Sequence, residues 1–133
     1  MAESHTPYTV FAFESRKPGM SLDLFRYYYE NIHVPLFMML VQPEEHMISY
    51  TRHYIQREEA DRPELSQYDT SSADIMGYDA IVRTVFKSKA AMEAMLKKFA
   101  EVQDQILEDE KNFLDKSKEK VVFVEDFPSM KIV

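Results

Sequence analysis

The stretch "YTVFAFESRKPGMSLDLFRYYYENIHVP", residues 8–35, changes from one hydrophobic periodicity to another. Its first nine residues favour β-structure and alternate in character, which predicts a strand over 8–16. A Pro-Gly turn at 18–19 ends that strand, and Ser21 is a natural helix N-cap. Apolar residues then recur at helical spacing, so we expect a helix that ends by Val34, because the following proline disfavours helical backbone before it.

The rest of the chain extends this strand–helix unit and then repeats it. The piece "LFMMLV" is expected to resume the helix up to Pro43, and the alternation of residues predicts strands over 47–57, 78–86 and 120–127. A long helix with one apolar stripe is expected over 88–114. The order β-α-β, then β-α-β, is that of a ferredoxin-like α+β sandwich, in which the helices cover one face of the sheet.

The length of the chain predicts the number of domains, and the apolar strands predict the oligomeric state. The 133 residues are enough for one domain, 1–133, with a single core. Several strands are apolar on both faces, so the sheet face opposite the helices should not be left in water. We therefore expect a symmetric homodimer that packs sheet to sheet and forms a dimeric α+β barrel.

Composition and charge exclude several classes of function. The net charge of −7 disfavours nucleic acid as a partner, and the absence of cysteine excludes disulfides and Cys-based zinc sites. The first residues, "MAESHTPYTVF", lack the pattern of a secretory signal, and no apolar run approaches the roughly 20 residues that a bilayer requires. We expect a cytoplasmic protein without a membrane partner.

The segment 58–77 is polar, contains a proline and shows neither helical nor strand periodicity. It exceeds the usual length of an unstructured connection within a domain. We expect either a mobile lid or a disordered loop.

Three segments together resemble the EthD family. They are "RKPGMSLDLFRYYYENIHVPL" (16–36), "GYDAIVRTVF" (77–86) and "DEKNFLDKSKEKVVFVED" (109–126). The resemblance implies a dimeric α+β barrel of the kind associated with aromatic polyketide tailoring. Some relatives in that family act as decarboxylases, dehydratases or cyclases, typically with acid–base groups alone and with no metal or organic cofactor.

The resemblance singles out two residues as candidates for catalysis. His33 matches the histidine of the family's H-x-P motif, and imidazole can exchange protons near neutral pH. Its alternative role is that of a helix-end or turn histidine. Asp79 matches the aspartate of a Tyr-Asp motif and can orient His33 or act as a base, unless it only binds backbone amides where the strand begins. Asp109 and Asp115 also match, but we expect both to be structural.

The strand over 47–57 offers further candidates on its two faces. Either Tyr50, Arg52 and Tyr54 line the cavity beneath the helices, or His53 does, because the alternation of a strand separates the two sets. Tyr50 and His53 are candidate catalytic groups, and Arg52 can clamp a carboxylate or an enolate oxygen. The predicted substrate-binding residues are Arg52, Tyr54, Tyr29, Phe37 and Tyr78.

Taken together, these residues predict an enzyme that needs neither metal nor cofactor. His46 with His33 and His53 gives only a weak metal motif without a spacing signature. We expect a cofactor-free lyase, a decarboxylase or dehydratase, or a cyclase that acts on an aromatic polyketide-type substrate. One alternative is a dimer that binds a small aromatic ligand, or supports another enzyme, without catalysis. A heme- or metal-linked monooxygenase is the third possibility.

Overall fold

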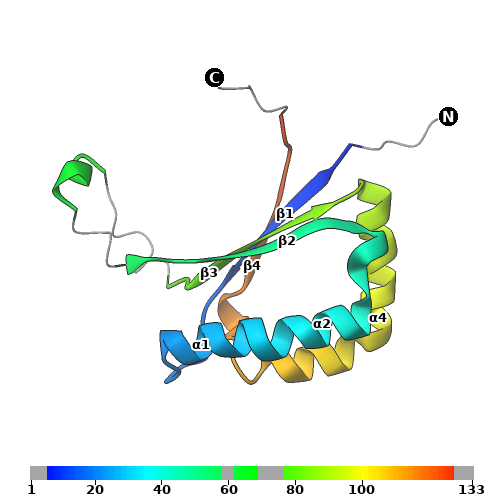
Figure 1. The fold of residues 1–133 in the computed structure, drawn as a ribbon, viewed down its shortest axis with the longest axis horizontal. Helices are drawn as coiled ribbons and strands as arrows, with labels where there is room; N and C mark the ends of the chain where they lie inside the picture. Colours follow the sequence, from blue (N-terminus) through cyan, green and yellow to red (C-terminus); the bar gives the residue numbers. More distant parts are fainter. Residues whose placement is uncertain (1–5, 58–61, 69–76, 128–133) are drawn as a thin grey trace.

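The computed structural model describes residues 6–57, 62–68 and 77–127, and its strands and helices follow the predicted order (Figure 1). Short 3-10 turns lie at Pro43–Glu45, Pro63–Leu65 and Lys116–Lys118. The longer elements are β1 (Tyr8–Glu14), α1 (Leu22–Tyr28), a π-helical turn (Tyr29–His33), α2 (Val34–Val41), β2 (Met47–Tyr54), β3 (Ala80–Phe86), α4 (Lys89–Glu110) and β4 (Lys120–Val124).

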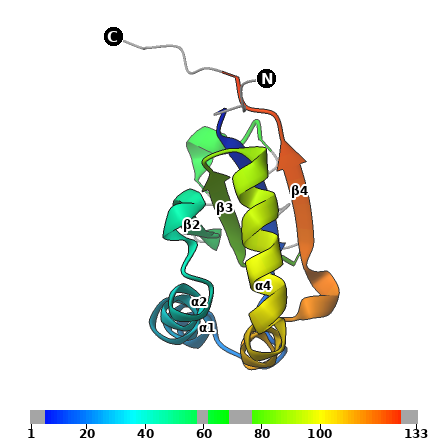
Figure 2. The same ribbon diagram turned by 90° about the vertical axis from the view of Figure 1, so that its right-hand side faces the viewer.

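The four strands form one sheet with the order β2-β3-β1-β4, in which all neighbours are antiparallel. The helices lie on one face of the sheet (Figure 2). This arrangement confirms the predicted α+β, ferredoxin-like fold. Each strand is shorter than predicted at one end, because the pairing stops while the alternating pattern of the sequence continues.

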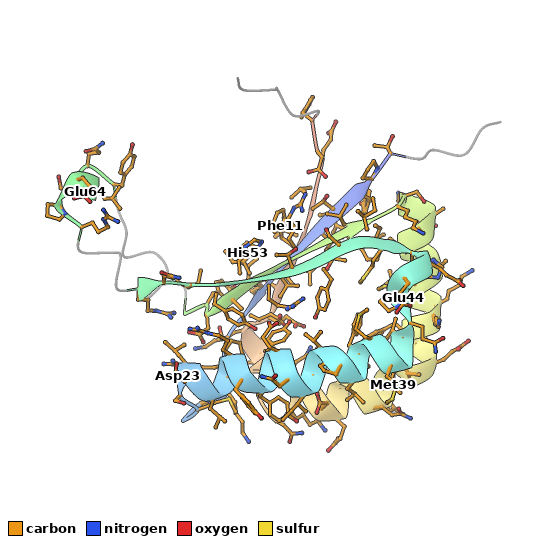
Figure 3. The ribbon with its side chains drawn as sticks, viewed as in Figure 1. Phe11, Asp23, Met39, Glu44, His53 and Glu64 are labelled. Atoms are coloured by element: carbon orange, nitrogen blue, oxygen red, sulfur yellow. The ribbon has the colours of Figure 1, made fainter. Side chains whose placement is uncertain are left out.

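The strand register decides which side chains meet under the helices. Ala12 pairs with Val82 on one side and with Val121 on the other, so these three side chains share the face that the helices cover. Phe11 and His53 lie on the opposite face (Figure 3). No described element covers that opposite face.

The first helix continues past Pro35, so the prediction that it ends by Val34 is wrong. Val34 is helical and its N–H donates to the carbonyl of Tyr29 five residues earlier, within a π-helical turn. This wider turn leaves room for the ring of Pro35, which occupies the first turn of α2, where a missing N–H costs little. The helix then ends at Gln42, whose backbone is left-handed, just before Pro43.

The π-helical turn also keeps one side of this helix facing the core. The buried residues recur at intervals of four: Phe25, Tyr29, His33, Phe37 and Val41. In a regular α-helix each step of four residues rotates the side chain about 40° further around the axis, so such a row would gradually turn away from the core. One wider turn in the middle offsets that drift.

Serine caps begin both helices, as the sequence predicts for Ser21. The hydroxyl of Ser21 accepts a hydrogen bond from the N–H of Leu24 at 3.1 Å, and that of Ser88 accepts from the N–H of Ala91 at 3.0 Å. No helix in the described part of the chain is long and apolar enough to cross a bilayer. Of the predicted loop 58–77, the structure describes 62–68, which contains a 3-10 turn. The choice between lid and disorder concerns mainly 58–61 and 69–76, which lie outside the described residues.

Candidate functional site

A cavity of about 280 Å³ lies between the sheet and the helices. Leu96, Val121 and Phe123 line it and are still about half exposed, so the cavity opens to solvent between α4 and β4. The remaining apolar walls come from every layer of the fold: Val10, Ala12, Phe37, Met47, Val82, Phe86, Met92, Met95, Phe99 and Ile106. Its polar groups are few and specific, as is typical of small-molecule sites.

His33 reaches this cavity from the π-helical turn and is held by an aspartate. Its Nδ1 lies 2.8 Å from Oδ2 of Asp109, and Oδ1 of the same carboxylate accepts a hydrogen bond from the Tyr28 hydroxyl at 2.6 Å. Because an ionised carboxylate only accepts hydrogen bonds, Nδ1 carries a proton, and in the neutral imidazole Nε2 is the nitrogen with the lone pair. The ring also packs against Phe113, with 4.9 Å between centroids. This geometry fixes both the tautomer and the orientation of the imidazole.

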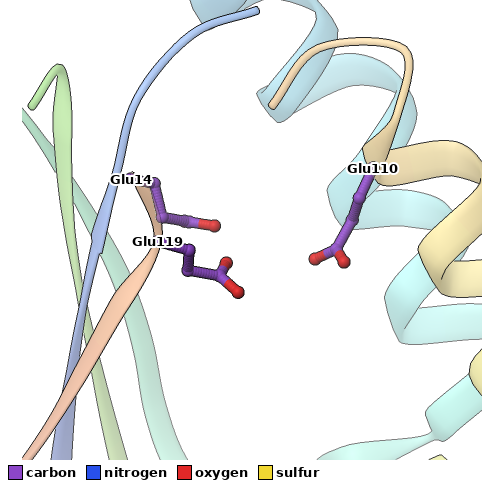
Figure 4. A group of neighbouring side chains, drawn as sticks. All are labelled: Glu14, Glu110 and Glu119. Atoms are coloured by element: carbon purple, nitrogen blue, oxygen red, sulfur yellow. The ribbon is translucent and has the colours of Figure 1, made fainter. Parts of the chain in front are cut away.

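Three carboxyl groups gather in another part of the cavity wall. Figure 4 shows Glu14 at the end of β1 beside Glu119, which precedes β4, with Glu110 facing them from the end of α4. One oxygen of each lies within 4.8 Å of the others. Lys116 donates to Glu110 and to Glu119, each at 2.7 Å. One ammonium group therefore partly neutralises three carboxyls.

The environment of Glu14 keeps a proton on its carboxyl group. Burial, followed by a hydrogen bond to Glu119, raises the pKa of Glu14 to about 8, whereas the hydrogen bond from the Tyr29 hydroxyl opposes that rise. Burial also raises the pKa of Glu110, against the effect of Lys116. Glu14 is thus a neutral acid at pH 7, and it can donate a proton to a group in the cavity.

Four of the predicted site residues line the cavity together: His33, Tyr50, Tyr29 and Phe37. Burial raises the pKa of the Tyr29 and Tyr50 hydroxyls, so both remain protonated. The Tyr29 hydroxyl donates its hydrogen bond to Glu14, and that of Tyr50 can donate to a ligand. The strand alternation is thereby resolved in favour of the Tyr50 face.

Arg52 and Tyr54 share that face but do not line the cavity, contrary to the predicted substrate-binding roles. Arg52 donates to Glu30 through Nε and Nη2, each at 2.8 Å, and its guanidinium lies 4.8 Å from the centre of the Tyr50 ring. The Tyr54 hydroxyl donates to the same carboxylate. These contacts with Glu30 engage both side chains in holding the helix against the sheet.

Asp79 does not orient His33, so that expectation is corrected in favour of Asp109. The carboxylate of Asp79 accepts a hydrogen bond from the N–H of Arg16 at 2.8 Å and pairs with Arg57 at 3.1 Å, where β3 is about to begin. It therefore has the backbone-binding role that was its alternative. Asp109, which we expected to be structural, is the residue that holds the imidazole.

The remaining predicted residues lie away from the cavity. His53 is exposed on the opposite face of the sheet, because its strand neighbours take the inner positions. Tyr78 packs against Phe13, 5.5 Å between ring centroids, on that same outer side. Asp115 is structural as predicted, since its carboxylate accepts from the N–H and hydroxyl of Ser117 at the start of a short turn.

Among the described residues, the one cluster of side chains close enough to hold a metal ion is Glu14, Glu110 and Glu119. The ammonium of Lys116 already lies against two of these carboxyls and would compete with a cation. His33, His46 and His53, the weak metal motif of the sequence, do not come together. The cluster is better suited to holding protons than to binding a metal.

The glutamate cluster was missed in the sequence, although the pattern contains a signal for it. Alternate residues of a strand point to the same face, so Glu14 shares the face of Val10 and Ala12. In the same way, Glu119 continues the series of Val121 and Phe123. A charged residue that continues an inward-facing apolar series is unusual unless it has a function.

The fold and the cavity define a ferredoxin-like domain with a pocket between its sheet and helices that His33 and three glutamates line. The EthD domain model matches residues 17–117, and the chain belongs to the EthD family. Two solved structures are similar to it over nearly the whole chain, both of the Arabidopsis thaliana protein At3g17210. A crystal structure, refined as an ensemble, has 17% identity and a TM-score of 0.54 and covers 93% of this chain and 99% of that one.

The other is a solution structure of the same plant protein, described as hypothetical. It has 19% identity, a TM-score of 0.51 and coverage of 100% of this chain and 97% of that one. At these identities the likeness concerns the fold. A comparison with functionally curated proteins gives no match.

Proposed function

We propose that this protein is a cofactor-free lyase, a decarboxylase or dehydratase, or a cyclase, and that its substrate is an aromatic polyketide-type molecule. One observation carries the proposal: an imidazole fixed by Asp109 shares an apolar cavity with the protonated carboxyl of Glu14. A base and an acid are thus available in a cavity whose walls are largely apolar. The aromatic and methionine walls suit a flat, apolar ligand.

Each group has a defined role in this proposal. Nε2 of His33 accepts a proton from an acidic carbon or a phenol, and the interaction of Nδ1 with Asp109 stabilises the imidazolium that forms. Glu14 donates its proton to an oxygen of the substrate or of a leaving group. Tyr50 donates a hydrogen bond to a carbonyl oxygen, where negative charge develops during reaction.

The proposal is tested by incubating the protein with aromatic polyketide-type hydroxy ketones and acids. Mass spectrometry detects the loss of water or carbon dioxide, and chromatography detects the isomer that a cyclase would form. We expect His33→Ala to lower turnover by about 100-fold or more. The matched control is His46→Ala, which removes the same side chain from a position that does not line the cavity, and it should leave turnover unchanged. Full turnover by folded His33→Ala would refute the assignment, and binding without conversion would indicate a ligand carrier instead.

We also propose that two copies pack through the outer face of the sheet. Phe11 and Val122 lie opposite each other on that face, and Val122 is 44% exposed. A second copy would remove this apolar surface from water. Light scattering should give about twice the monomer mass of 15.7 kDa, and Phe11→Glu should give a monomer. A wild-type mass equal to that of one chain would contradict the proposal.

A further inference from the structure

Apart from the imidazole of His33, which is paired with Asp109 at 2.8 Å, the groups that line the cavity are negatively charged or neutral. Its titratable groups are His33, the three glutamates and the two tyrosines already described, and no lysine or arginine of the described residues lines it. Lys116 approaches the cluster from outside the lining, and both of its contacts at 2.7 Å are to the carboxyls of Glu110 and Glu119. The cavity therefore offers a negatively charged ligand no cation that is not already paired with a carboxylate.

The arginine closest to this site in the sheet is also committed elsewhere. Arg52 binds Glu30 with two N–H groups, donates to the carbonyl of Tyr50 at 2.6 Å and covers the Tyr50 ring. A bidentate pair of this kind resists exchange for another carboxylate, because the first partner would be left unpaired. Arg52, which the sequence suggested as a ligand for a substrate carboxylate, is thus not available to a substrate.

A ligand carboxylate would meet two penalties in this cavity. It would lose its hydration among apolar walls without gaining a cationic partner. It would also lie near the carboxyls of Glu110 and Glu119, of which Lys116 can neutralise only one charge. A phenol or a ketone meets neither penalty, because the glutamates accept hydrogen bonds from hydroxyl groups, and Glu14 and Tyr50 donate them to carbonyl oxygens.

We infer that the cavity selects an uncharged hydroxyl-bearing aromatic ketone and excludes the corresponding acid, so that dehydration or cyclisation, not decarboxylation, is the reaction at this site. This inference rests on the proposed acid–base function and narrows its substrate class. The hydroxyl-bearing end of the ligand lies at the glutamates, and its apolar rings extend toward the mouth at Leu96 and Phe123.

The elimination of water balances with the groups present. Nε2 of His33 takes the proton from the carbon next to the ketone, and the electron pair of that C–H bond forms the new C=C bond. The C–O bond to the β-hydroxyl breaks, and the Glu14 proton joins the departing oxygen to give water. Return of the proton from His33 to Glu14 restores the enzyme, so no oxidant, reductant or metal is consumed.

A pair of probes with the same ring system tests the charge selection: 2-naphthol, which is neutral at pH 7, and 2-naphthoate, which is an anion. We expect 2-naphthol to bind at least about tenfold more tightly than 2-naphthoate by titration calorimetry. Glu119→Gln removes one negative charge from the cavity and should narrow that ratio, and Glu110→Gln is a second variant with the same expected effect. Glu108→Gln, an exposed change on α4, is the matched control and should leave the ratio unchanged.

Equal or tighter binding of 2-naphthoate would overturn the inference, and so would failure of both probes to bind. Neither result would refute the acid–base function, which depends on the turnover of His33→Ala compared with His46→Ala. A loss of turnover in His33→Ala with an acid that releases carbon dioxide would support the general function and refute the substrate class. The two proposals therefore fail in distinguishable ways.

Discussion

Glu14 and Glu30 are both glutamates on the helix side of the sheet, yet their surroundings are opposite. The carboxylate of Glu30 receives two N–H groups from Arg52 and the hydroxyl of Tyr54, and the hydrogen bonds from Arg52 hold its pKa below the ordinary value. Glu14 faces other carboxyls, and burial raises its pKa to about 8. The charge of Glu30 holds two elements together, whereas Glu14 retains a proton that chemistry can use.

The same contrast separates two of the three aspartates that match the family's motifs. Asp79 is buried against Arg57 and a backbone N–H, so its charge is satisfied by groups that belong to the fold. Asp109 instead binds a histidine that lines the cavity. A carboxylate with a full set of structural partners is a poor candidate for catalysis, even when it is buried.

The largest expected effect concerns stability, at Asp79. Asp79→Ala leaves Arg57 without this carboxylate and the Arg16 N–H without its acceptor, so we expect the free energy of unfolding to fall by about 3–5 kcal/mol. Urea denaturation followed by circular dichroism measures this loss. Asp79→Asn keeps an acceptor oxygen and should lose less stability. A loss below about 1 kcal/mol in Asp79→Ala would show that the contacts of Asp79 do not stabilise the fold.

A second prediction concerns the pH dependence that Glu14 causes. Its pKa is about 8 in the folded protein and near the ordinary 4.5 in the unfolded chain, so the folded state binds more protons between these values. Stability should therefore fall as the pH rises from about 4.5 to 8, by about 2–4 kcal/mol from this group. Glu14→Gln should remove that slope and stabilise the protein at pH 8. A slope in denaturation experiments that survives this substitution would show that Glu14 is not its source.

Glu30 should give the opposite sign and a smaller effect. Its lowered pKa contributes stability above the ordinary value of 4.5, and that stability is lost as the pH falls through the folded value. Glu30→Gln should cost about 1 kcal/mol at pH 7, because the pair with Arg52 is partly exposed and solvent screens it. In the same denaturation series, the difference from wild type should shrink as the pH falls through the folded pKa of Glu30. A difference that grows toward acid pH would reverse the interpretation of this pair.

Tyr28→Phe is expected to have the smallest effect. It removes one hydrogen bond to Asp109, at 2.6 Å, and leaves the contact between Asp109 and His33 intact. We expect a loss of about 0.5–1 kcal/mol in thermal unfolding. Turnover should fall much less than in Asp109→Asn, and an equal fall in both variants would show that Tyr28 positions the imidazole as strongly as Asp109 does.

The fold was predictable because short stretches of sequence determine each of its strands and helices. Alternation along the strands and the helical spacing in 88–114 are properties of neighbouring residues, and the order of elements then allowed few arrangements. The helix through Pro35 was missed for a related reason. A proline is normally a sign that a helix ends, and only the π-helical turn before it makes continuation possible.

The site was less predictable, because it depends on contacts between distant segments. His33 was found through its motif and the chemistry of imidazole, and the expected tyrosines of the cavity followed from the strand and helix patterns. Its partner Asp109 lies 76 positions further along the chain. Glu14 and Glu119 meet only because β1 and β4 are adjacent in the sheet, and no local pattern contains that adjacency.

The π-helical turn at Tyr29–His33 makes the site unusually sensitive to chain length. Loss of one residue there, such as the exposed Asn31, would leave the two halves of the helix nearly in phase, because Phe25 and Phe37 would then be eleven residues apart, about 20° from a whole number of turns. The wider turn would be lost, however, and the ring of Pro35 would meet the backbone carbonyl four residues before it, which kinks or breaks a helix. In the evolution of such a domain, a single-codon deletion at this point can therefore displace the imidazole of His33 and leave the architecture recognisable.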